Sequence, residues 1–150
     1  MVVIAPGSLY GSLGAALVVG GVADALAGSP ARKVYVCNLV GEHGQTDDFK
    51  THDYASEIER FLGGKTKLDY VLYNTGKPDA GLLQRYFTQE GRAWVGYDKT
   101  ALDKQHYTAI GGDFLANGGN HSRTFIRHDG NKVAASLMDI LRVGRGKVKQ

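Results

Sequence analysis

The chain has 150 residues, of which 43% are hydrophobic and 22% are charged. This composition describes one soluble globular domain and excludes a disordered or fibrous chain. The net charge is +3, but four positive charges and no negative one fall at the end of the chain: Arg142, Arg145, Lys147 and Lys149. We therefore expect a solvated basic tail over residues 143–150 and no specific nucleic-acid partner.

The single cysteine, Cys37, excludes an internal disulfide and is typical of a reducing compartment. No basic leader follows Met1, and the longest apolar stretch, Leu13–Leu26, is too short to cross a bilayer. We expect a cytoplasmic protein that does not bind a membrane.

The first half of the chain alternates predicted strands with predicted helices. Val2–Ala5 is an apolar run that ends in a turn, which is typical of a strand buried on both faces. A helix is expected over Leu13–Leu26, broken at Gly20-Gly21, and a second strand over Lys33–Cys37. After a long polar loop, apolar residues at helical spacing predict a helix over Thr51–Leu62.

The second half continues the same alternation. A third strand is predicted over Asp69–Tyr73, a helix capped by its first residue over Asp79–Gln89, and a fourth strand over Ala93–Tyr97. Shorter or later elements are expected at Tyr107–Ile110 (strand), 111–122 (loop or linker), Thr124–Arg127 (strand) and Asn131–Leu141 (helix).

This rhythm predicts an α/β fold: a three-layer, Rossmann-like sandwich with a mostly parallel sheet covered by helices on both faces. Such a fold rarely begins its first strand at residue 2, so we expect residues 1–142 to be a partial domain. Ligands of parallel sheets bind beyond the carboxyl ends of the strands. Three polar loops begin there: Pro6–Ser12, Asn38–Thr51 and Asn74–Pro78.

The turn at Gly7-Ser8 joins a buried strand to a helix, so its backbone N–H groups could bind phosphate. Its spacing matches neither a Walker loop nor a dinucleotide fingerprint. Ser8 also lacks the flanking glycines of a hydrolase nucleophile. Phosphate binding and a plain strand–helix turn both remain open.

Other polar residues have two interpretations each. Arg127 could form a bidentate contact with a diphosphate, or it could pair with an acid at the surface. Tyr86 could stack on a base, but a tyrosine on a helix is more often part of the core or its rim. Cys37 is expected to be a small buried residue. The acids and histidines of the long loop match no zinc or calcium spacing, so no metal site is predicted: His43, Asp47, Asp48 and His52.

Five stretches together resemble one family: Val-Ile-Ala-Pro-Gly-Ser-Leu-Tyr at 3–10, Lys-Val-Tyr-Val-Cys-Asn-Leu at 33–39, Gly-Gln-Thr-Asp at 44–47, Asp-Tyr-Val-Leu-Tyr-Asn at 69–74 and Ile-Arg-His-Asp at 126–129. They are similar to the YvcK-like proteins, or gluconeogenesis factors, a branch of the CofD-like (2-phospho-L-lactate transferase) superfamily. The resemblance covers nearly the whole chain. It implies the carboxyl-terminal half of a longer Rossmann-like domain.

The resemblance implies two functions. The YvcK-like branch binds UDP-sugars, notably UDP-N-acetylglucosamine, and regulates carbon flow into the cell envelope, and hence cell shape, without catalysis. The transferase branch moves 2-phospholactate from a guanosine diphosphate carrier to a deazaflavin with magnesium, held by acids expected in the other half. We therefore expect no catalytic residue here, and magnesium only for a transferase. A third hypothesis is a scaffold that forms a homodimer or pairs with the missing amino-terminal half.

By position, the resemblance implies nucleotide-binding roles for nine residues: Gly7, Ser8, Leu9, Asn38, Thr46, Asn74, Tyr86, Arg127 and His128. Gly7 and Ser8 would face phosphate, with Asn38 and Thr46 on the same rim. Tyr86 and Arg127 would serve the uridine diphosphate part of the pocket.

Overall fold

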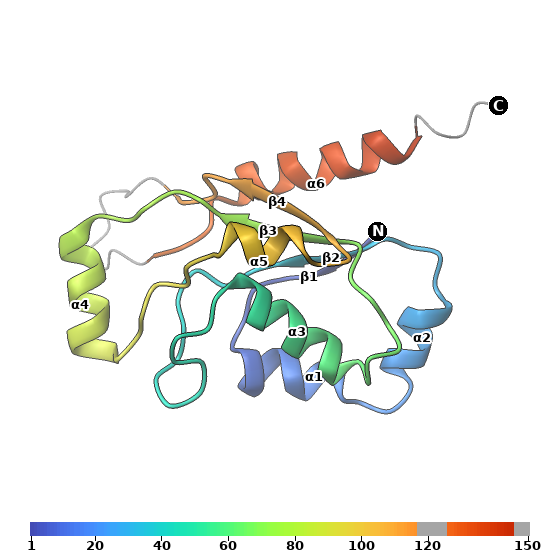
Figure 1. Ribbon diagram of the computed structural model, residues 1–150, viewed down its shortest axis with the longest axis horizontal. Helices are drawn as coiled ribbons and strands as arrows, with labels where there is room; N and C mark the ends of the chain where they lie inside the picture. Colours follow the sequence, from blue (N-terminus) through green and yellow to red (C-terminus); the bar gives the residue numbers. More distant parts are fainter. Residues whose placement is uncertain (117–125, 146–150) are drawn as a thin grey trace.

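The computed structural model describes residues 1–116 and 126–145. Its sheet has four parallel strands, in the order β1-β2-β3-β4. Their bounds are β1 Val2–Ile4, β2 Lys33–Val36, β3 Tyr70–Asn74 and β4 Thr108–Gly112. Because all four strands run the same way, their carboxyl ends lie at one edge of the sheet, toward helix α4 (Ala80–Glu90) in Figure 1.

Besides α4, the described residues form a π-helical segment, η1 (Leu9–Gly14), and five α-helices. These are α1 (Ala15–Leu17), α2 (Val22–Gly28), α3 (Thr51–Phe61), α5 (Lys99–Asp103) and α6 (Gly130–Arg145). η1 runs directly into α1, so one helical segment covers Leu9–Leu17. Within the described ranges no single helix is long and apolar enough to cross a bilayer. Only the pair Leu9–Leu17 and Val22–Gly28, bent by 69°, passes that test by length and composition.

The helices form a layer on each face of the sheet, so the predicted three-layer sandwich is confirmed (Figure 1). Strand order follows chain order, and right-handed crossovers then place the connecting helices on one face. Helices α1, α2, α3 and α5 pack there on Ile4, Tyr35 and Val71. Among the described elements only α6 covers the opposite face, with Val133, Leu137 and Ile140 packed against Val34, Val36 and Leu72.

Local signals in the sequence placed most elements correctly. The first helix breaks at the predicted glycines, where Gly21 has φ +88°, although the helix begins earlier than expected, at Leu9. Asp79 caps α4 by accepting the Leu82 N–H at 3.1 Å. Asp129 begins α6 by accepting the Asn131 N–H at 2.9 Å. These positions depend on chemistry within a few residues of chain, which a sequence displays.

The predicted strand over Ala93–Tyr97 is wrong. The segment makes one isolated antiparallel bridge, between Trp94 and Val40, outside the sheet. The place beside β3 is taken by Thr108–Gly112, which the sequence indicated only as a short fifth strand. Helix α5, capped by Asp98, was not predicted.

Three further predictions lie near the end of the chain. In the predicted strand Thr124–Arg127, the first two residues lie outside the described ranges, and His128, beyond its end, forms a single bridge with Leu115. Half of the predicted loop over 111–122 also lies outside, and its first two residues belong to β4. Helix α6 extends past Leu141 to Arg145, so residues 143–145 of the expected tail are helical.

Candidate functional site

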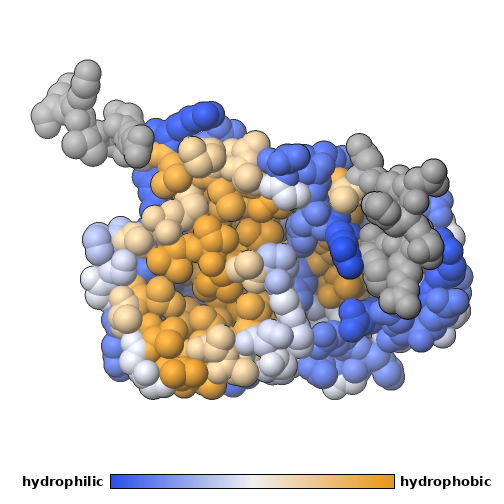
Figure 2. Space-filling view, turned by 180° about the vertical axis from the view of Figure 1, so that it is seen from behind, coloured by the Kyte–Doolittle hydropathy of each residue, from blue (hydrophilic) through white to orange (hydrophobic). Residues whose placement is uncertain are grey.

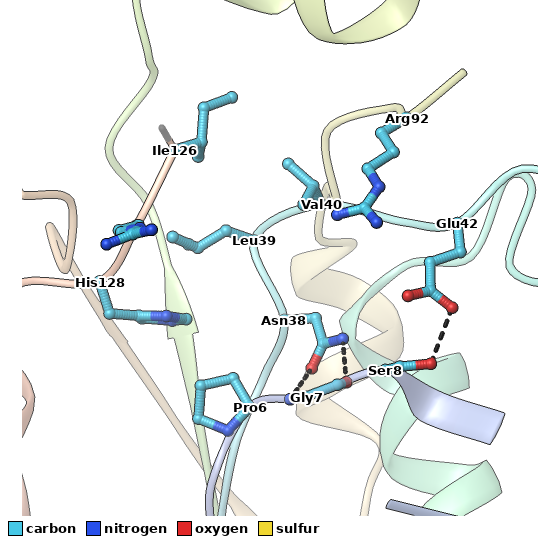
Figure 3. Close-up of a pocket in the computed structure, with 11 residues that line it drawn as sticks. Pro6, Gly7, Ser8, Asn38, Leu39, Val40, Glu42, Arg92, Ile126 and His128 are labelled. Atoms are coloured by element: carbon cyan, nitrogen blue, oxygen red, sulfur yellow. Dashed lines mark hydrogen bonds between the residues drawn. The ribbon is translucent and has the colours of Figure 1, made fainter. Parts of the chain in front are cut away.

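The turn after β1 is held in place by Asn38, which follows β2. Asn38 Nδ2 donates to the Gly7 carbonyl at 2.7 Å, and the Gly7 N–H donates back to Asn38 Oδ1 at 3.4 Å (Figure 3). The Tyr35 hydroxyl donates to the same Oδ1 at 3.2 Å. These bonds join the carboxyl ends of two neighbouring strands and fix where the next helix starts.

Ser8 begins that helix. Its Oγ accepts the Gly11 N–H at 3.2 Å. The same Oγ donates to Glu42 Oε2 at 2.9 Å (Figure 3). The first turn of a helix presents backbone N–H groups and a partial positive charge, which favour an anion. The Glu42 carboxylate is therefore an internal anion beside the helix start, and a ligand phosphate would compete with it for Ser8.

These residues line a pocket of about 260 Å³ at the carboxyl edge of the sheet (Figure 3). Its wall comes from the turn after β1, the loop after β2, the segment before α6, and Arg92, which follows the C-cap of α4 at Gly91. The lining residues are Pro6, Gly7, Ser8, Asn38, Leu39, Val40, Glu42, Arg92, Ile126, Arg127 and His128. The structure thus brings together five of the nine predicted residues: Gly7, Ser8, Asn38, Arg127 and His128.

The pocket has the charge and size of a binding site for part of a nucleotide. Arg92 and Arg127 line it together with the helix start at Ser8, and guanidinium groups suit the paired oxygens of a diphosphate. Its volume is slightly below the ~300–1,000 Å³ of typical small-molecule sites. A pocket of this volume is too small to enclose a whole nucleotide sugar on every side.

His128 contributes a neutral ring to this pocket. Burial lowers the pKa of His128 from its ordinary value, and a hydrogen bond with the Cys37 backbone opposes the shift only in part. The ring is therefore suited to a hydrogen bond rather than to a charge pair. Burial also raises the pKa of Cys37 to about 12, so Cys37 is a buried thiol, as expected, and not a nucleophile.

The other predicted site residues lie outside the pocket lining. The Leu9 side chain is in the core. The Thr46 hydroxyl accepts from Tyr54 at 2.9 Å and from the Glu42 N–H at 2.8 Å, so it closes the loop before α3. Asn74 is buried at the end of β3, where its Oδ1 accepts the Phe114 N–H at 2.9 Å. Thr46 and Asn74 thus shape the loops at this edge through internal bonds.

Tyr86 does not line the pocket but bonds a residue that does. It is buried on α4 with Leu39 and Ile126, and its hydroxyl accepts the Ile126 N–H at 2.9 Å. Ile126 is followed directly by Arg127 and His128, so this bond positions the segment that carries both. Tyr86 therefore lies in the core, which is the second of the two interpretations that the sequence allowed.

Two charged lining residues, Glu42 and Arg92, were not among the predicted site residues. Both residues line the pocket because the loop after β2 pairs with the segment after α4. The Gly41 N–H donates to the Ala93 carbonyl at 2.8 Å, and the Val95 N–H donates to the Leu39 carbonyl at 2.9 Å. No short-range pattern signals this long-range pairing. In the part of the chain that is described, no three His, Cys, Asp or Glu side chains gather as a metal site.

Tyr86→Phe should loosen the wall that holds Arg127. The variant removes the acceptor of a buried N–H, a change that costs about 1–3 kcal/mol. Amide hydrogen exchange should speed up at Ile126 by tenfold or more, while exchange at Val71 in β3 stays unchanged. Equal exchange at Ile126 in the two proteins would contradict the positioning role.

His128 should make stability depend on pH. Because its pKa is lower in the folded protein than in the unfolded chain, the unfolded chain binds the proton more readily. The stabilisation of the folded protein by neutral His128 is therefore complete above pH 6.5, the ordinary pKa of histidine. It is lost as the pH falls below that value. Urea unfolding of His128→Gln should show a flatter profile than wild type between about pH 5 and 7. The matched control is His43→Gln, at an exposed position, and it should keep the wild-type slope.

Comparisons with known proteins identify relatives along the whole described fold. The family model for 2-phospho-L-lactate transferase CofD matches residues 1–115. A "Putative gluconeogenesis factor" from Thermotoga maritima is 35% identical over 144 residues, which are 95% of this chain and 44% of the relative. Another of the same description from Clostridium acetobutylicum is 33% identical, over 93% of this chain and 30% of the relative.

A solved structure has the same fold. A protein member of the UPF0052 family from Bacillus halodurans superimposes with a TM-score of 0.79 and 28% identity, over 91% of this chain and 42% of that one. The chain therefore spans less than half the length of the relatives it matches. On the family match and these relatives, the chain belongs to the CofD family.

Proposed function

We propose that the chain contributes the diphosphate-binding part of a nucleotide-sugar site, with UDP-N-acetylglucosamine as the first ligand to test. One observation carries this proposal: a single pocket joins the helix start at Ser8 to Arg92 and Arg127. A helix N-terminus and two guanidinium groups at the carboxyl ends of parallel strands favour the phosphates of a nucleotide.

The remaining features support a binding role rather than chemistry. Among the described residues that line the pocket the one acid is Glu42, which is already engaged by Ser8. The thiol of Cys37 is buried. The names of the relatives favour a role in carbon metabolism. We propose that the protein acts in the cytoplasm. Binding of the nucleotide sugar would there regulate carbon flow into the cell envelope.

A transferase of 2-phospholactate is the second candidate, because the matching family model carries that description. Such an enzyme would bind guanosine diphosphate in place of a uridine nucleotide. The acids for its magnesium would then come from outside the described residues, which gather no metal site of their own.

UDP-N-acetylglucosamine should raise the midpoint of a thermal melt of this chain. A ligand that binds only the folded form stabilises it by about 2.7 kcal/mol at one hundred times its Kd. Arg127→Ala should weaken binding by about tenfold or more, because hydrogen bonds to charged groups contribute ~1.5–3 kcal/mol. Calorimetric titration of both proteins measures the difference.

The control is Arg85→Ala, an exposed arginine of α4 outside the pocket lining, which should bind like wild type. A melt that moves with guanosine diphosphate and not with UDP would favour the transferase. A melt that moves with neither nucleotide nor with inorganic diphosphate would contradict the proposed site.

A further inference from the structure

Glu42 places a negative charge in a pocket whose other charged side chains are positive. It lines the pocket together with Arg92 and Arg127, and its Oε2 accepts the Ser8 Oγ–H at 2.9 Å (Figure 3). Ser8 does not need this partner to cap its helix, because its Oγ already accepts the Gly11 N–H at 3.2 Å. Helix capping therefore does not account for the carboxylate.

The backbone that carries Glu42 is held on both sides of the residue. The Glu42 N–H donates to Thr46 Oγ1 at 2.8 Å, and the Glu42 carbonyl accepts the Thr46 N–H at 2.9 Å. Thr46 is buried, and its hydroxyl also accepts the Tyr54 O–H at 2.9 Å. A ligand phosphate at Ser8 therefore meets a carboxylate whose backbone cannot move away without breaking these bonds.

The charge of Glu42 has no cation beside it that would cancel it. None of the ion pairs formed within the described ranges includes Glu42. Arg92, by contrast, lies near an acid outside the lining, with its Nε 3.5 Å from Glu90 Oε2. The lining thus carries two positive charges, on Arg92 and Arg127, and one negative charge, on Glu42.

The pocket belongs to the more polar end of the molecule. Figure 2 shows mostly hydrophilic surface at the end that holds α4, on the right of the view, and a broad apolar area toward the other end. The carboxyl ends of the strands point toward α4, so the pocket lies at this polar end. A ligand there is selected by charge and hydrogen bonding more than by apolar burial.

We propose that Glu42 is a specificity-determining residue, which selects a diphosphate substituted at both ends over one with a free end. Each phosphate of a doubly substituted diphosphate carries one negative charge, and the two guanidinium groups match these two charges. A free terminal phosphate gains a further charge, because its second ionisation has a pKa of about 6. That charge meets the Glu42 carboxylate, and like charges in one site repel. Glu42 thereby favours a nucleotide sugar over the nucleoside diphosphate that remains when the sugar is lost.

This selection rests on the proposed diphosphate site, but it does not depend on the base or the sugar. It depends on the number of charges that the phosphates carry. Inorganic diphosphate, which has two free ends, therefore reports on Glu42 even where no nucleotide binds. Water screens the charges of an open pocket, so the removal of one carboxylate is expected to change affinity by about tenfold.

Titrations of wild type and Glu42→Gln at about pH 8, followed by the amide chemical shifts of Ser8 and Gly11, test this role. Glutamine keeps an oxygen that accepts the Ser8 Oγ–H, so the thermal melt should stay that of wild type. The variant should bind inorganic diphosphate and UDP about tenfold more tightly, and UDP-N-acetylglucosamine less than about threefold more tightly. The control is Asp24→Asn, which removes the same charge at an exposed position outside the lining and should bind all three ligands like wild type.

Three results would overturn the role of Glu42. Glu42→Gln could bind inorganic diphosphate no more tightly than wild type, or it could gain as much affinity for the nucleotide sugar as for UDP. An equal gain in Asp24→Asn would assign the effect to the net charge of the whole chain. Failure of both proteins to bind UDP-N-acetylglucosamine would contradict the proposed function instead, and a tenfold gain for inorganic diphosphate would still support the role of Glu42.

Discussion

The amide of Asn38 holds together the edge of the sheet on which the candidate site depends. It bonds both backbone groups of Gly7 and is itself oriented by the Tyr35 hydroxyl. Because Gly7 is held, Ser8 starts the helix at one place and meets Glu42. Asn38 is half-buried, and replacing its amide would remove three hydrogen bonds at once. The position of the helix start, and therefore of any bound phosphate, follows from this one side chain.

The topology of the sheet explains both the place of the site and the exposure of β1. A parallel sheet whose strand order follows chain order brings every strand-end loop to one edge. The same order places the connecting helices on one face, and leaves α6 to cover the other. The pocket at the strand ends and the exposure of Val3 in β1 are therefore two consequences of one arrangement.

Local chemistry in the sequence predicted much of the fold. The apolar runs at β1, β2 and β3, the break at Gly21 and the caps Asp79 and Asp129 each depend on residues close in the chain. The strand predicted over Ala93–Tyr97 failed because its alternation reflects packing on a loop, a tertiary contact that a local pattern does not distinguish from a sheet.

The rule for parallel sheets predicts only the site residues that follow strands, whereas Arg127 and His128 were predicted from the family resemblance. Gly7, Ser8 and Asn38 come directly after β1 and β2, and the rule for parallel sheets places them together. Arg92 and Glu42 reach the pocket through the pairing of two distant loops. The link between Tyr86 and Ile126 spans 40 positions of the chain. Such contacts appear only once the chain is folded.

The most direct test of the account is a titration of the isotopically labelled chain with UDP-N-acetylglucosamine, followed by amide chemical shifts. The amides of Gly7, Ser8, Asn38 and Arg127 should move together with one dissociation constant, while those of α3 stay in place. A second cavity of about 260 Å³ lies beside Phe49 and Trp94. Shifts confined to that cavity, or no shifts at all, would contradict the assignment of the nucleotide site.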